Sequence, residues 1–139
     1  LASLLDFAPT ILDLCGVSIP EGATPPVVEA KQQLDPWPGN SLAPILRSEA
    51  DSVQDVVLVE NDEDYLGLKL RTIITERYKM TVYQGQPFGE LFDLQDDPNE
   101  LYNRWEHSDY QQIRVDLTHR LLDEIIRTDS VLPRRLAHA

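Results

Sequence analysis

Residues 70–101 read LRTIITERYKMTVYQGQPFGELFDLQDDPNEL, and this stretch decides the fold class that the sequence predicts. Short runs of β-branched, aromatic and other apolar residues alternate in it with a Gly/Pro turn at residues 85–89 and an acidic turn at residues 96–99. Such runs, bounded by Gly, Pro and Asp, are typical of β-strands joined by tight turns. Sequential strands with short connections usually pair as antiparallel neighbours. The stretch therefore predicts part of an antiparallel sheet.

Outward from this stretch, the pattern predicts four strands in all. A run of β-branched and apolar residues, VVLV at residues 56–59, begins the first of them. The expected strands cover residues 56–62, 66–75, 77–84 and 90–94. Each is short and is followed by a turn rich in Gly, Pro or acidic residues, as strands of a meander are.

A long helix is expected over residues 109–128, because the apolar period there changes from two to about four. Its main apolar stripe is reinforced by Leu122 and Ile126, and Ser108 and Gln111 have the spacing of a capping box. The residues of that stripe are Ile113, Leu117, Leu121 and Ile125. Such a stripe needs an apolar surface to cover, and the sheet supplies one.

The N-terminal part of the chain predicts a short helix over residues 7–15. Asp6 can accept hydrogen bonds from free amides at its start, Pro9 fits its first turn, and Gly16 suits the left-handed position after its end. Residues 17–39 include seven Gly or Pro and predict a long loop. The fold class is therefore α+β: about four antiparallel strands with one long C-terminal helix packed on them, plus a short N-terminal helix and a long Pro/Gly-rich loop.

Charge and composition exclude several classes of partner. The chain has 24 acidic and 12 basic residues, a net charge of −12, which repels nucleic acid and anionic membranes. No apolar run approaches the roughly 20 residues that span a bilayer. The chain opens inside an apolar pattern without an initiator Met, so we expect it to begin within a larger protein. Cys15 is the single cysteine, which leaves the cellular compartment open.

Few residues suggest chemistry of their own. Cys15 lies among leucines with no His close in sequence, so a buried and inert thiol is expected. The acidic runs at residues 62–64 and 96–100 lack the alternating oxygen ligands of a calcium loop. The scattered histidines lack the spacing of a zinc site. Trp37 and Trp105 could stack on a sugar ring, although a partly buried packing role is the more usual one.

The acidic turn at residues 61–65 is the best geometric candidate for contact with a substrate. It follows a strand, and side chains at strand ends project from a rigid scaffold. The candidate residues bordering a cleft are Asp62, Asp64, Tyr65 and Lys69. A solvated hairpin tip without a binding role is the alternative interpretation.

Four motifs in one order resemble a known family. Residues 6–16, DFAPTILDLCG, resemble the Asp-x-x-Pro-Thr-Leu-Leu-Asp-x-x-Gly helix of sulfatases, and residues 39–46, GNSLAPIL, resemble their Gly-x-Ser-Leu-x-Pro-Leu-Leu turn. Arg-Thr and then Arg-Tyr-Lys within residues 71–79, and GELFDLQDDPNE at residues 89–100, resemble two further family patterns. Together they resemble the C-terminal subdomain of the sulfatase family, within the alkaline phosphatase superfamily.

This resemblance implies a parent enzyme that hydrolyses sulfate esters. In the family, a Cys or Ser within Cys/Ser-x-Pro-x-Arg is converted to formylglycine, and a calcium ion with Lys, Arg and His side chains stabilises charge on the sulfate. Cys15 is followed by Gly16, Val17 and Ser18, so it does not match the nucleophile motif. No catalytic residue and no metal ligand is carried over to this chain, which is expected to be inactive by itself.

The resemblance also implies a division of the chain and a structural role for the motif residues. Residues 1–16 would end the large α/β domain of the parent, residues 17–55 would be a loop-rich connection, residues 56–130 the sheet-and-helix subdomain, and residues 131–139 a frayed tail. The motif residues expected to be structural are Arg71, Arg77, Tyr78, Lys79, Asp93, Asp97 and Pro98.

The implied partners are the N-terminal catalytic domain of the same parent chain and a small anionic sulfate ester. Without that domain, the chain is expected to self-associate through exposed apolar residues, namely Leu1, Leu4, Leu5 and Ile11. Two alternatives stay open: the same region of a phosphonate or phosphate monoester hydrolase, and an interaction module with no catalytic parent.

Overall fold

The structure, a computed structural model, describes residues 1–18, 39–63, 65 and 67–128. The expected tail at residues 131–139 lies outside these residues, as does most of the Pro/Gly-rich loop. The chain divides into two compact units. Residues 1–2 and 54–127 form the first, here called the sheet unit, and residues 3–53 and 128–139 form the second, the helix unit.

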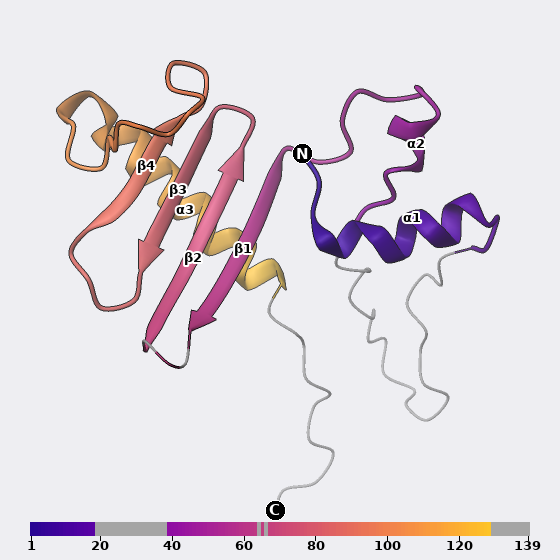
Figure 1. Cartoon of the computed structure of the whole chain (residues 1–139), viewed down its shortest axis with the longest axis horizontal. Helices are drawn as coiled ribbons and strands as arrows, with labels where there is room; N and C mark the ends of the chain where they lie inside the picture. Colours follow the sequence, from indigo (N-terminus) through magenta and orange to yellow (C-terminus); the bar gives the residue numbers. More distant parts are fainter. Residues whose placement is uncertain (19–38, 64, 66, 129–139) are drawn as a thin grey trace, which may run out of the picture. The chain divides into compact units, whose positions relative to one another are not determined.

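The sheet unit contains an antiparallel sheet in which every strand pairs with its neighbour in sequence, in the order β1-β2-β3-β4 (Figure 1). The strands are β1 (Val56–Glu63), β2 (Leu68–Thr75), β3 (Tyr78–Tyr83) and β4 (Gly89–Asp93). A 3-10 turn, η2 (Ser108–Tyr110), leads into the long helix α3 (Gln111–Thr128). The predicted α+β fold is confirmed, with four antiparallel strands and one long C-terminal helix.

The core of the sheet unit follows from the register of the strands. Leu58 pairs with Ile73, Ile73 with Met80, and Met80 with Leu91, so one apolar residue from each strand lies in a single row. Side chains in such a row point to the same face of the sheet. Leu117 and Leu121 of α3 pack against this row to form the buried cluster.

Two residues of the predicted apolar stripe do not join this core. Leu122 and Ile126 are exposed on α3, so the expectation that they reinforce the sheet-facing stripe was wrong. The reason is geometric: a helix covers a sheet with a stripe of limited width, which Leu117, Leu121 and the partly buried Ile113 and Ile125 already fill.

The start of α3 also differs in detail from the predicted capping box. His107, not Ser108, is the capping residue of η2, and its side chain accepts a hydrogen bond from the Asp109 amide. Gln111 donates its side-chain amide to the carbonyl oxygens of Trp105 and His107. The start of the helical segment was therefore predicted correctly, but the capping residue is His107, one residue before the predicted Ser108, because the 3-10 turn η2 precedes α3.

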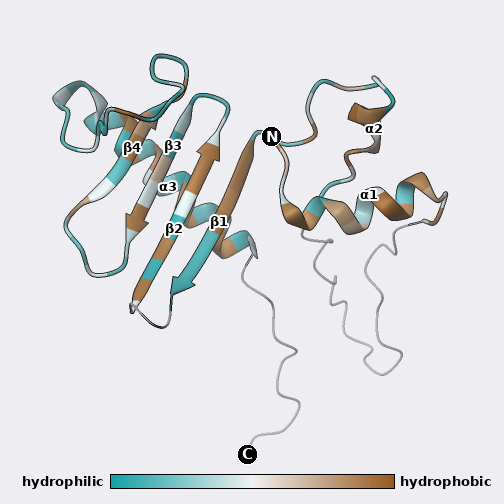
Figure 2. Ribbon diagram, viewed as in Figure 1, coloured by the Kyte–Doolittle hydropathy of each residue, from teal (hydrophilic) through white to brown (hydrophobic). Residues whose placement is uncertain are grey.

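The outer edge of β4 is covered by the chain that follows it. The Asn103 side chain accepts from the Leu91 amide at 3.0 Å and donates to the Gly89 carbonyl at 3.0 Å. The Arg104 amide then donates to the Leu91 carbonyl at 2.7 Å. These bonds satisfy groups that an edge strand would otherwise expose. At β1, apolar residues fill the first half and hydrophilic residues the second half, toward the β2 turn (Figure 2).

The helix unit contains the 3-10 turn η1 (Leu4–Asp6) and the helices α1 (Phe7–Leu14) and α2 (Ala43–Leu46). Ser3 and Asp6 form a capping box at the start of η1, in which the Asp6 carboxylate accepts from the Ser3 amide at 2.6 Å. Asp6 therefore accepts a hydrogen bond from a free amide at the helix start, as predicted. It does so as the third residue after the capping residue Ser3 and not as the capping residue itself. Gly16, with φ of 69°, lies directly after the end of the helix and takes the expected left-handed conformation.

We predict that Gly89→Ala destabilises the sheet unit by about 1–3 kcal/mol, because a Cβ at this position would overpack the core. That atom would lie 2.5 Å from the Trp105 ring and 2.7 Å from the Thr81 carbonyl oxygen. Urea unfolding followed by Trp fluorescence measures the loss. Gly85→Asn is the control, because Gly85 has open space around it and Asn tolerates its φ of 71°. Equal unfolding midpoints for the two variants would contradict the prediction.

Candidate functional site

The β1–β2 hairpin carries the residues predicted to border a cleft. Asp62 on β1 faces Lys69 on β2 in the register of the two strands. Tyr65, in the turn between them, is 93% exposed, and Asp64 lies outside the described residues. The structure thus brings Asp62, Tyr65 and Lys69 to one end of the hairpin, where all three are exposed.

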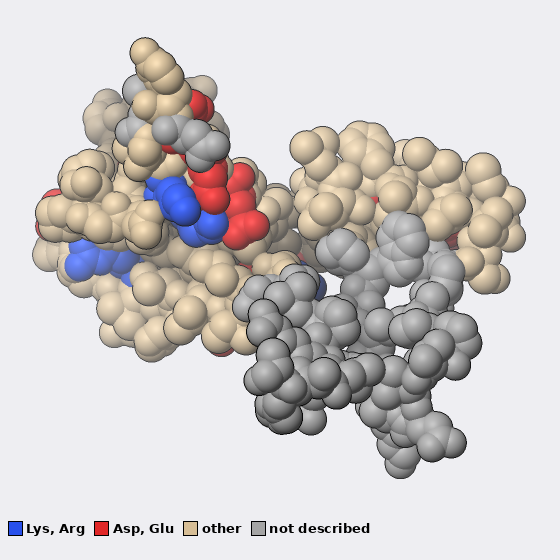
Figure 3. Space-filling view, turned by 90° about the horizontal axis from the view of Figure 1, so that it is seen from below, with Lys and Arg blue, Asp and Glu red and all other residues tan. Residues whose placement is uncertain are grey.

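Arg71 organises the charges of this hairpin. Its Nε lies 2.8 Å from Glu60 Oε1, and its Nη1 lies 2.7 Å from Asp62 Oδ1. The Arg71 hydrogen bond lowers the pKa of Asp62 below its usual range. In the view from below, basic and acidic side chains lie next to each other (Figure 3). The hairpin tip therefore combines paired charges with one fully exposed aromatic ring.

A buried carboxylate at the end of β4 contacts the residue before β3 and a residue of η2. Asp93 is fully buried, and Arg77 holds it with two nitrogens, Nε at 3.1 Å from Oδ1 and Nη2 at 2.8 Å from Oδ2. The Tyr110 hydroxyl donates to Oδ2 at 3.2 Å, and the Gln95 amide donates to Oδ1 at 3.3 Å. The Arg77 guanidinium lowers the pKa of Asp93, and burial raises the pKa of the Tyr110 hydroxyl. Both groups are thus held in the protonation state that this network needs.

The acidic turn after β4 bonds to its own backbone. The Asp97 amide donates to the Asp93 carbonyl at 2.7 Å, and the Asp97 carboxylate accepts from the Tyr102 amide at 2.8 Å. Pro98 follows Asp97 in this turn. Lys79 Nζ pairs with Glu100 Oε2 at 2.6 Å, which ties the turn to β3.

Residues 6–16 and residues 39–46, two of the motifs described in the sequence analysis, contact each other in the helix unit, and the sequence alone did not reveal this. Asp6, Thr10 and Asp13 share one face of the N-terminal helix and contact residues 39–47. Asp6 Oδ1 accepts from the Asn40 amide at 2.9 Å, and the Thr10 hydroxyl accepts from the Leu42 amide at 2.8 Å. The three polar side chains are spaced by four and then three residues, which places them on one helical face. That spacing is the signal from which a polar contact on this face could have been predicted.

Asp13 extends this contact, here called the α1 clamp, to its C-terminal end. The Ser41 hydroxyl donates to Asp13 Oδ2 at 2.7 Å, and Arg47 Nη2 lies 3.0 Å from Oδ1. The Ser41 hydrogen bond and the Arg47 charge lower the pKa of Asp13. Gly39 is also required, because a Cβ there would lie 2.1 Å from the Leu5 carbonyl oxygen. The clamp consists of Asp6, Thr10 and Asp13 on the helix side with Gly39, Asn40, Ser41, Leu42 and Arg47 opposite.

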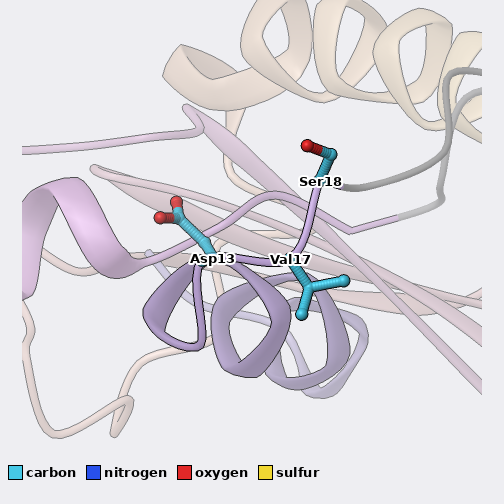
Figure 4. A pocket seen from close by; sticks show the side chains of 4 residues that line it. Asp13, Val17 and Ser18 are labelled. Atoms are coloured by element: carbon cyan, nitrogen blue, oxygen red, sulfur yellow. The ribbon is translucent and has the colours of Figure 1, made fainter.

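A cavity of about 310 Å³ lies at the C-terminal end of α1, lined by Asp13, Gly16, Val17 and Ser18 (Figure 4). Its one ionisable side chain, Asp13, is already engaged in the α1 clamp. Cys15 beside it is exposed, so the expected burial of the thiol was wrong. The reason is that the polar side of α1 packs inside the helix unit and leaves the apolar side outward.

The described residues do not fit a metal centre. Within them, no group of three or more His, Cys, Asp or Glu side chains is placed to hold a metal ion. Arg71 engages Glu60 and Asp62 of the hairpin. In the turn after β4, Lys79 engages Glu100 and the Tyr102 amide engages Asp97. No residue described here is therefore assigned to calcium. In the same part of the chain, no helix has the length and apolar character to cross a membrane.

Of the two tryptophans, Trp105 packs inside the sheet unit, against Gly89 and beneath the Arg114 guanidinium at 4.8 Å from the ring centroid. Trp37 lies outside the described residues. Sugar stacking at Trp105 would require an open ring face, and these contacts occupy the ring.

We predict that Asp93→Asn lowers the free energy of unfolding by about 1–3 kcal/mol at pH 7, less than a fully buried ion pair would lose, because Arg77 is half-exposed and can be solvated. Urea unfolding between pH 3 and pH 7 measures it. A carboxylate with a lowered pKa contributes stability above its unfolded pKa and loses it as the pH falls through the folded value. The difference between the wild type and the variant should therefore shrink below about pH 4. Asp96→Asn, at an exposed neighbour, is the control; a difference independent of pH would contradict the prediction.

We predict that Thr10→Val weakens the α1 clamp, because it leaves the partly buried Leu42 amide without its acceptor at a cost of about 1–2 kcal/mol. Hydrogen exchange at the Leu42 amide should accelerate by about tenfold, since an open clamp exposes it. Thr10→Ser keeps the hydroxyl and is the matched control. Equal exchange rates in the two variants would show that the hydroxyl does not hold residues 39–42.

Comparisons with known proteins agree with this architecture. Residues 1–127 match the family described as N-sulphoglucosamine sulphohydrolase, C-terminal. Among solved structures, the chain is similar to a candidate sulfatase of Bacteroides thetaiotaomicron VPI-5482, with 29% identity, a TM-score of 0.70 and coverage of 90% of this chain and 25% of that one. It is similar to BT1596, a 2-O GAG sulfatase, with 31% identity, a TM-score of 0.69 and coverage of 88% and 24%.

Two further relatives extend the comparison. The phosphonate monoester hydrolase of Agrobacterium radiobacter is 26% identical with a TM-score of 0.64, and the match covers 88% of this chain and 24% of that one. An uncharacterized protein of Haemophilus influenzae is 24% identical over 132 residues, which cover 95% of this chain and 60% of that protein. The chain thus spans about a quarter of the solved structures it resembles. With the family matched over nearly its whole length, the chain belongs to the sulfatase family of the alkaline phosphatase superfamily, and corresponds to its C-terminal region.

Proposed function

We propose that this chain is the C-terminal subdomain of an enzyme that hydrolyses sulfate esters, and that the subdomain has no such activity by itself. The observation that supports this most is the match of residues 1–127 to a C-terminal sulfatase family, together with coverage of only a quarter of the solved relatives. The catalytic chemistry would then belong to the remaining three quarters of such a protein.

The sequence of the chain supports the proposal that the catalytic residues lie elsewhere in the longer protein. Cys15-Gly16-Val17-Ser18 departs from the Cys/Ser-x-Pro-x-Arg motif in which sulfatases form formylglycine. The described residues hold no cluster suited to calcium. Formylglycine and calcium are therefore proposed for the longer protein, where they would supply the nucleophile and stabilise charge on the sulfate oxygens.

The part proposed for this chain is to support and border the substrate cleft. The β1–β2 hairpin is suited to that role because Arg71 fixes Glu60 and Asp62 on paired strands, while Tyr65 and Lys69 stay exposed. Lys69 can attract an anionic ester, and Tyr65 offers an aromatic face to a ring. Asp62, Asp64, Tyr65 and Lys69 remain the proposed cleft residues, and the substrate would be a small sulfate ester.

A second reaction is supported by a specific observation. The phosphonate monoester hydrolase of Agrobacterium radiobacter is 26% identical to the chain and covers as much of it as the 2-O GAG sulfatase does. Hydrolysis of phosphonate or phosphate monoesters is therefore the alternative proposal for the longer protein.

Hydrolysis of three p-nitrophenyl esters by the full-length protein tests these proposals. The sulfate, the phosphate and the phenylphosphonate are assayed with and without calcium, beside the 139-residue chain. A sulfate preference in the longer protein alone supports the proposal. A phosphonate or phosphate preference transfers the assignment to the alternative, and activity of the 139-residue chain on any ester would overturn its proposed inactivity.

The hairpin is tested by Tyr65→Ala and Lys69→Ala in the same full-length protein. We expect KM for the preferred ester to rise about three- to tenfold, with little change in kcat, because these side chains would bind substrate without taking part in the reaction. The matched control is Tyr102→Ala, at another exposed tyrosine in the turn after β4. Unchanged KM in both hairpin variants would remove the hairpin from the cleft.

A further inference from the structure

The Arg104 side chain carries a charge that has no partner in the described part of the chain. Five of the seven arginines described there pair with a carboxylate, namely Arg47, Arg71, Arg77, Arg120 and Arg127. Arg114 donates to the Trp105 carbonyl oxygen instead. The Arg104 guanidinium has neither kind of contact among these residues, although the chain has 24 acidic and only 12 basic residues. Its positive charge is therefore available to an anion from outside.

Contacts of the backbone and of the side chain hold Arg104 in place. Its amide donates to the Leu91 carbonyl oxygen at 2.7 Å, and its own carbonyl oxygen accepts from the His107 amide at 2.9 Å. The guanidinium carbon lies 5.7 Å from the ring centroid of Tyr102 and 5.7 Å from that of Tyr110. A planar guanidinium that stacks on aromatic rings loses little further freedom when it binds a ligand.

The two edges of this guanidinium differ in their surroundings. Nε is buried and has no hydrogen-bond partner among the described residues. The two terminal nitrogens also lack a partner there, but they are not buried in this way, and the residue as a whole is partly exposed. A cation that is partly removed from water attracts an anion more strongly than a fully solvated one. The terminal nitrogens can donate side by side to two oxygens of one ligand group.

We propose that Arg104 is a binding site for a small organic monoanion, whose charged group is a carboxylate or a sulfate monoester. Both groups present two or more oxygens to the flat edge of a guanidinium, and this is the geometry in which arginine binds oxyanions best. The rings of Tyr102 and Tyr110 keep the guanidinium in position for this contact. The site goes beyond the proposed role of the chain in ester hydrolysis and does not depend on it.

The surrounding charges favour a ligand with a single negative charge. Burial and the charges of Asp93 and Asp96 raise the pKa of the Tyr110 hydroxyl, whereas the Arg104 charge lowers it. All three charges therefore act at this place, and Arg77 already neutralises Asp93. A dianion such as a phosphate monoester would meet stronger repulsion from Asp96 and a larger desolvation cost. Arg104 supplies only one positive charge to offset them.

This site lies far from the β1–β2 hairpin tip. The strand register places Asp93 opposite Tyr78, at the end of the sheet where Val56 faces Thr75. The hairpin tip follows the pair of Glu63 with Leu68 at the other end. The eight residues of β2 between these ends span about 26 Å. Because Tyr110 contacts both Asp93 and the Arg104 guanidinium, a small ester at the hairpin would leave Arg104 open to a second molecule.

NMR spectra of the arginine Nε–H groups in the full-length protein test this proposal at a single residue. The Arg104 signal is assigned by its loss in Arg104→Lys, or through bonds from its backbone if that variant does not fold. Benzoate, benzenesulfonate and phenylphosphonate are titrated at about pH 8, as a carboxylate, a sulfate mimic that cannot be hydrolysed, and a dianion. We expect benzoate, benzenesulfonate or both to shift the Arg104 signal to saturation with Kd of about 1–10 mM. The Arg127 signal, from an arginine paired with Glu124, is the internal control.

Each outcome of this titration decides something. Saturation with benzoate alone identifies a carboxylate ligand, and saturation with benzenesulfonate alone identifies a sulfate monoester. An Arg104 signal that moves no more than the Arg127 signal with all three anions would overturn the site. Phenylphosphonate binding as tightly as the better monoanion would overturn the proposed ligand class. None of these readouts depends on ester hydrolysis, so loss of the sulfatase assignment would leave the result intact.

Calorimetry compares two substitutions that keep the positive charge. Arg104→Lys replaces the flat, two-point donor with a single ammonium, so we expect it to weaken binding of the better monoanion about tenfold. Arg127→Lys is the matched control and should bind like the wild type. The same anions can also enter the catalytic centre of the longer protein, so only the difference between the two variants counts. Equal affinity in both variants would show that Arg104 has a packing role alone.

Discussion

The buried carboxylate of Asp93 is the constraint on which the arrangement of the sheet unit depends. A charge without solvent contact must be paired, and this pairing comes from Arg77, which directly precedes β3, and from Tyr110 of η2. This fixes the end of β4 against the start of β3 and brings the chain before α3 close to the sheet. With that end in place, Leu117 and Leu121 meet the row formed by Ile73, Met80 and Leu91.

In the helix unit, the buried side of the helix is polar, and hydrogen bonds to residues 39–47 hold it in place. Asp6, Thr10 and Asp13 use side chains where an ordinary surface helix uses leucine, and the apolar residues are left on the outside. An isolated domain gains nothing from that arrangement, since exposed apolar surface is unfavourable in water. It becomes reasonable when the chain is part of a larger fold, which agrees with relatives about four times as long.

Much of the fold could be predicted, because each strand and the long helix carry local signals. The β-branched run at residues 56–59, the Gly/Pro turn at 85–89 and the four-residue period from Ile113 to Ile125 each reflect local preferences. The errors arose where contact with other elements decides. The exposure of Cys15, Leu122 and Ile126 depends on which side of a helix is covered, and the position of the helix cap depended on η2. For the candidate site, the order of Asp62, Tyr65 and Lys69 around a turn was readable, but the pairing of Arg71 with Glu60 and Asp62 required the strand register.

The sequence by itself determined the fold class, the family and the absence of the sulfatase nucleophile motif from these 139 residues. All three can be recognised from local residue patterns and from the order of short motifs along the chain. Only the tertiary structure decided that the helix motif at residues 6–16 and the turn motif at residues 39–46 are two halves of one contact. Only it decided that Asp93 is buried between Arg77 and Tyr110, and that α1 turns its apolar side outward. The physical reason is the same in each case: burial and pairing depend on residues distant in sequence, which local preferences do not specify.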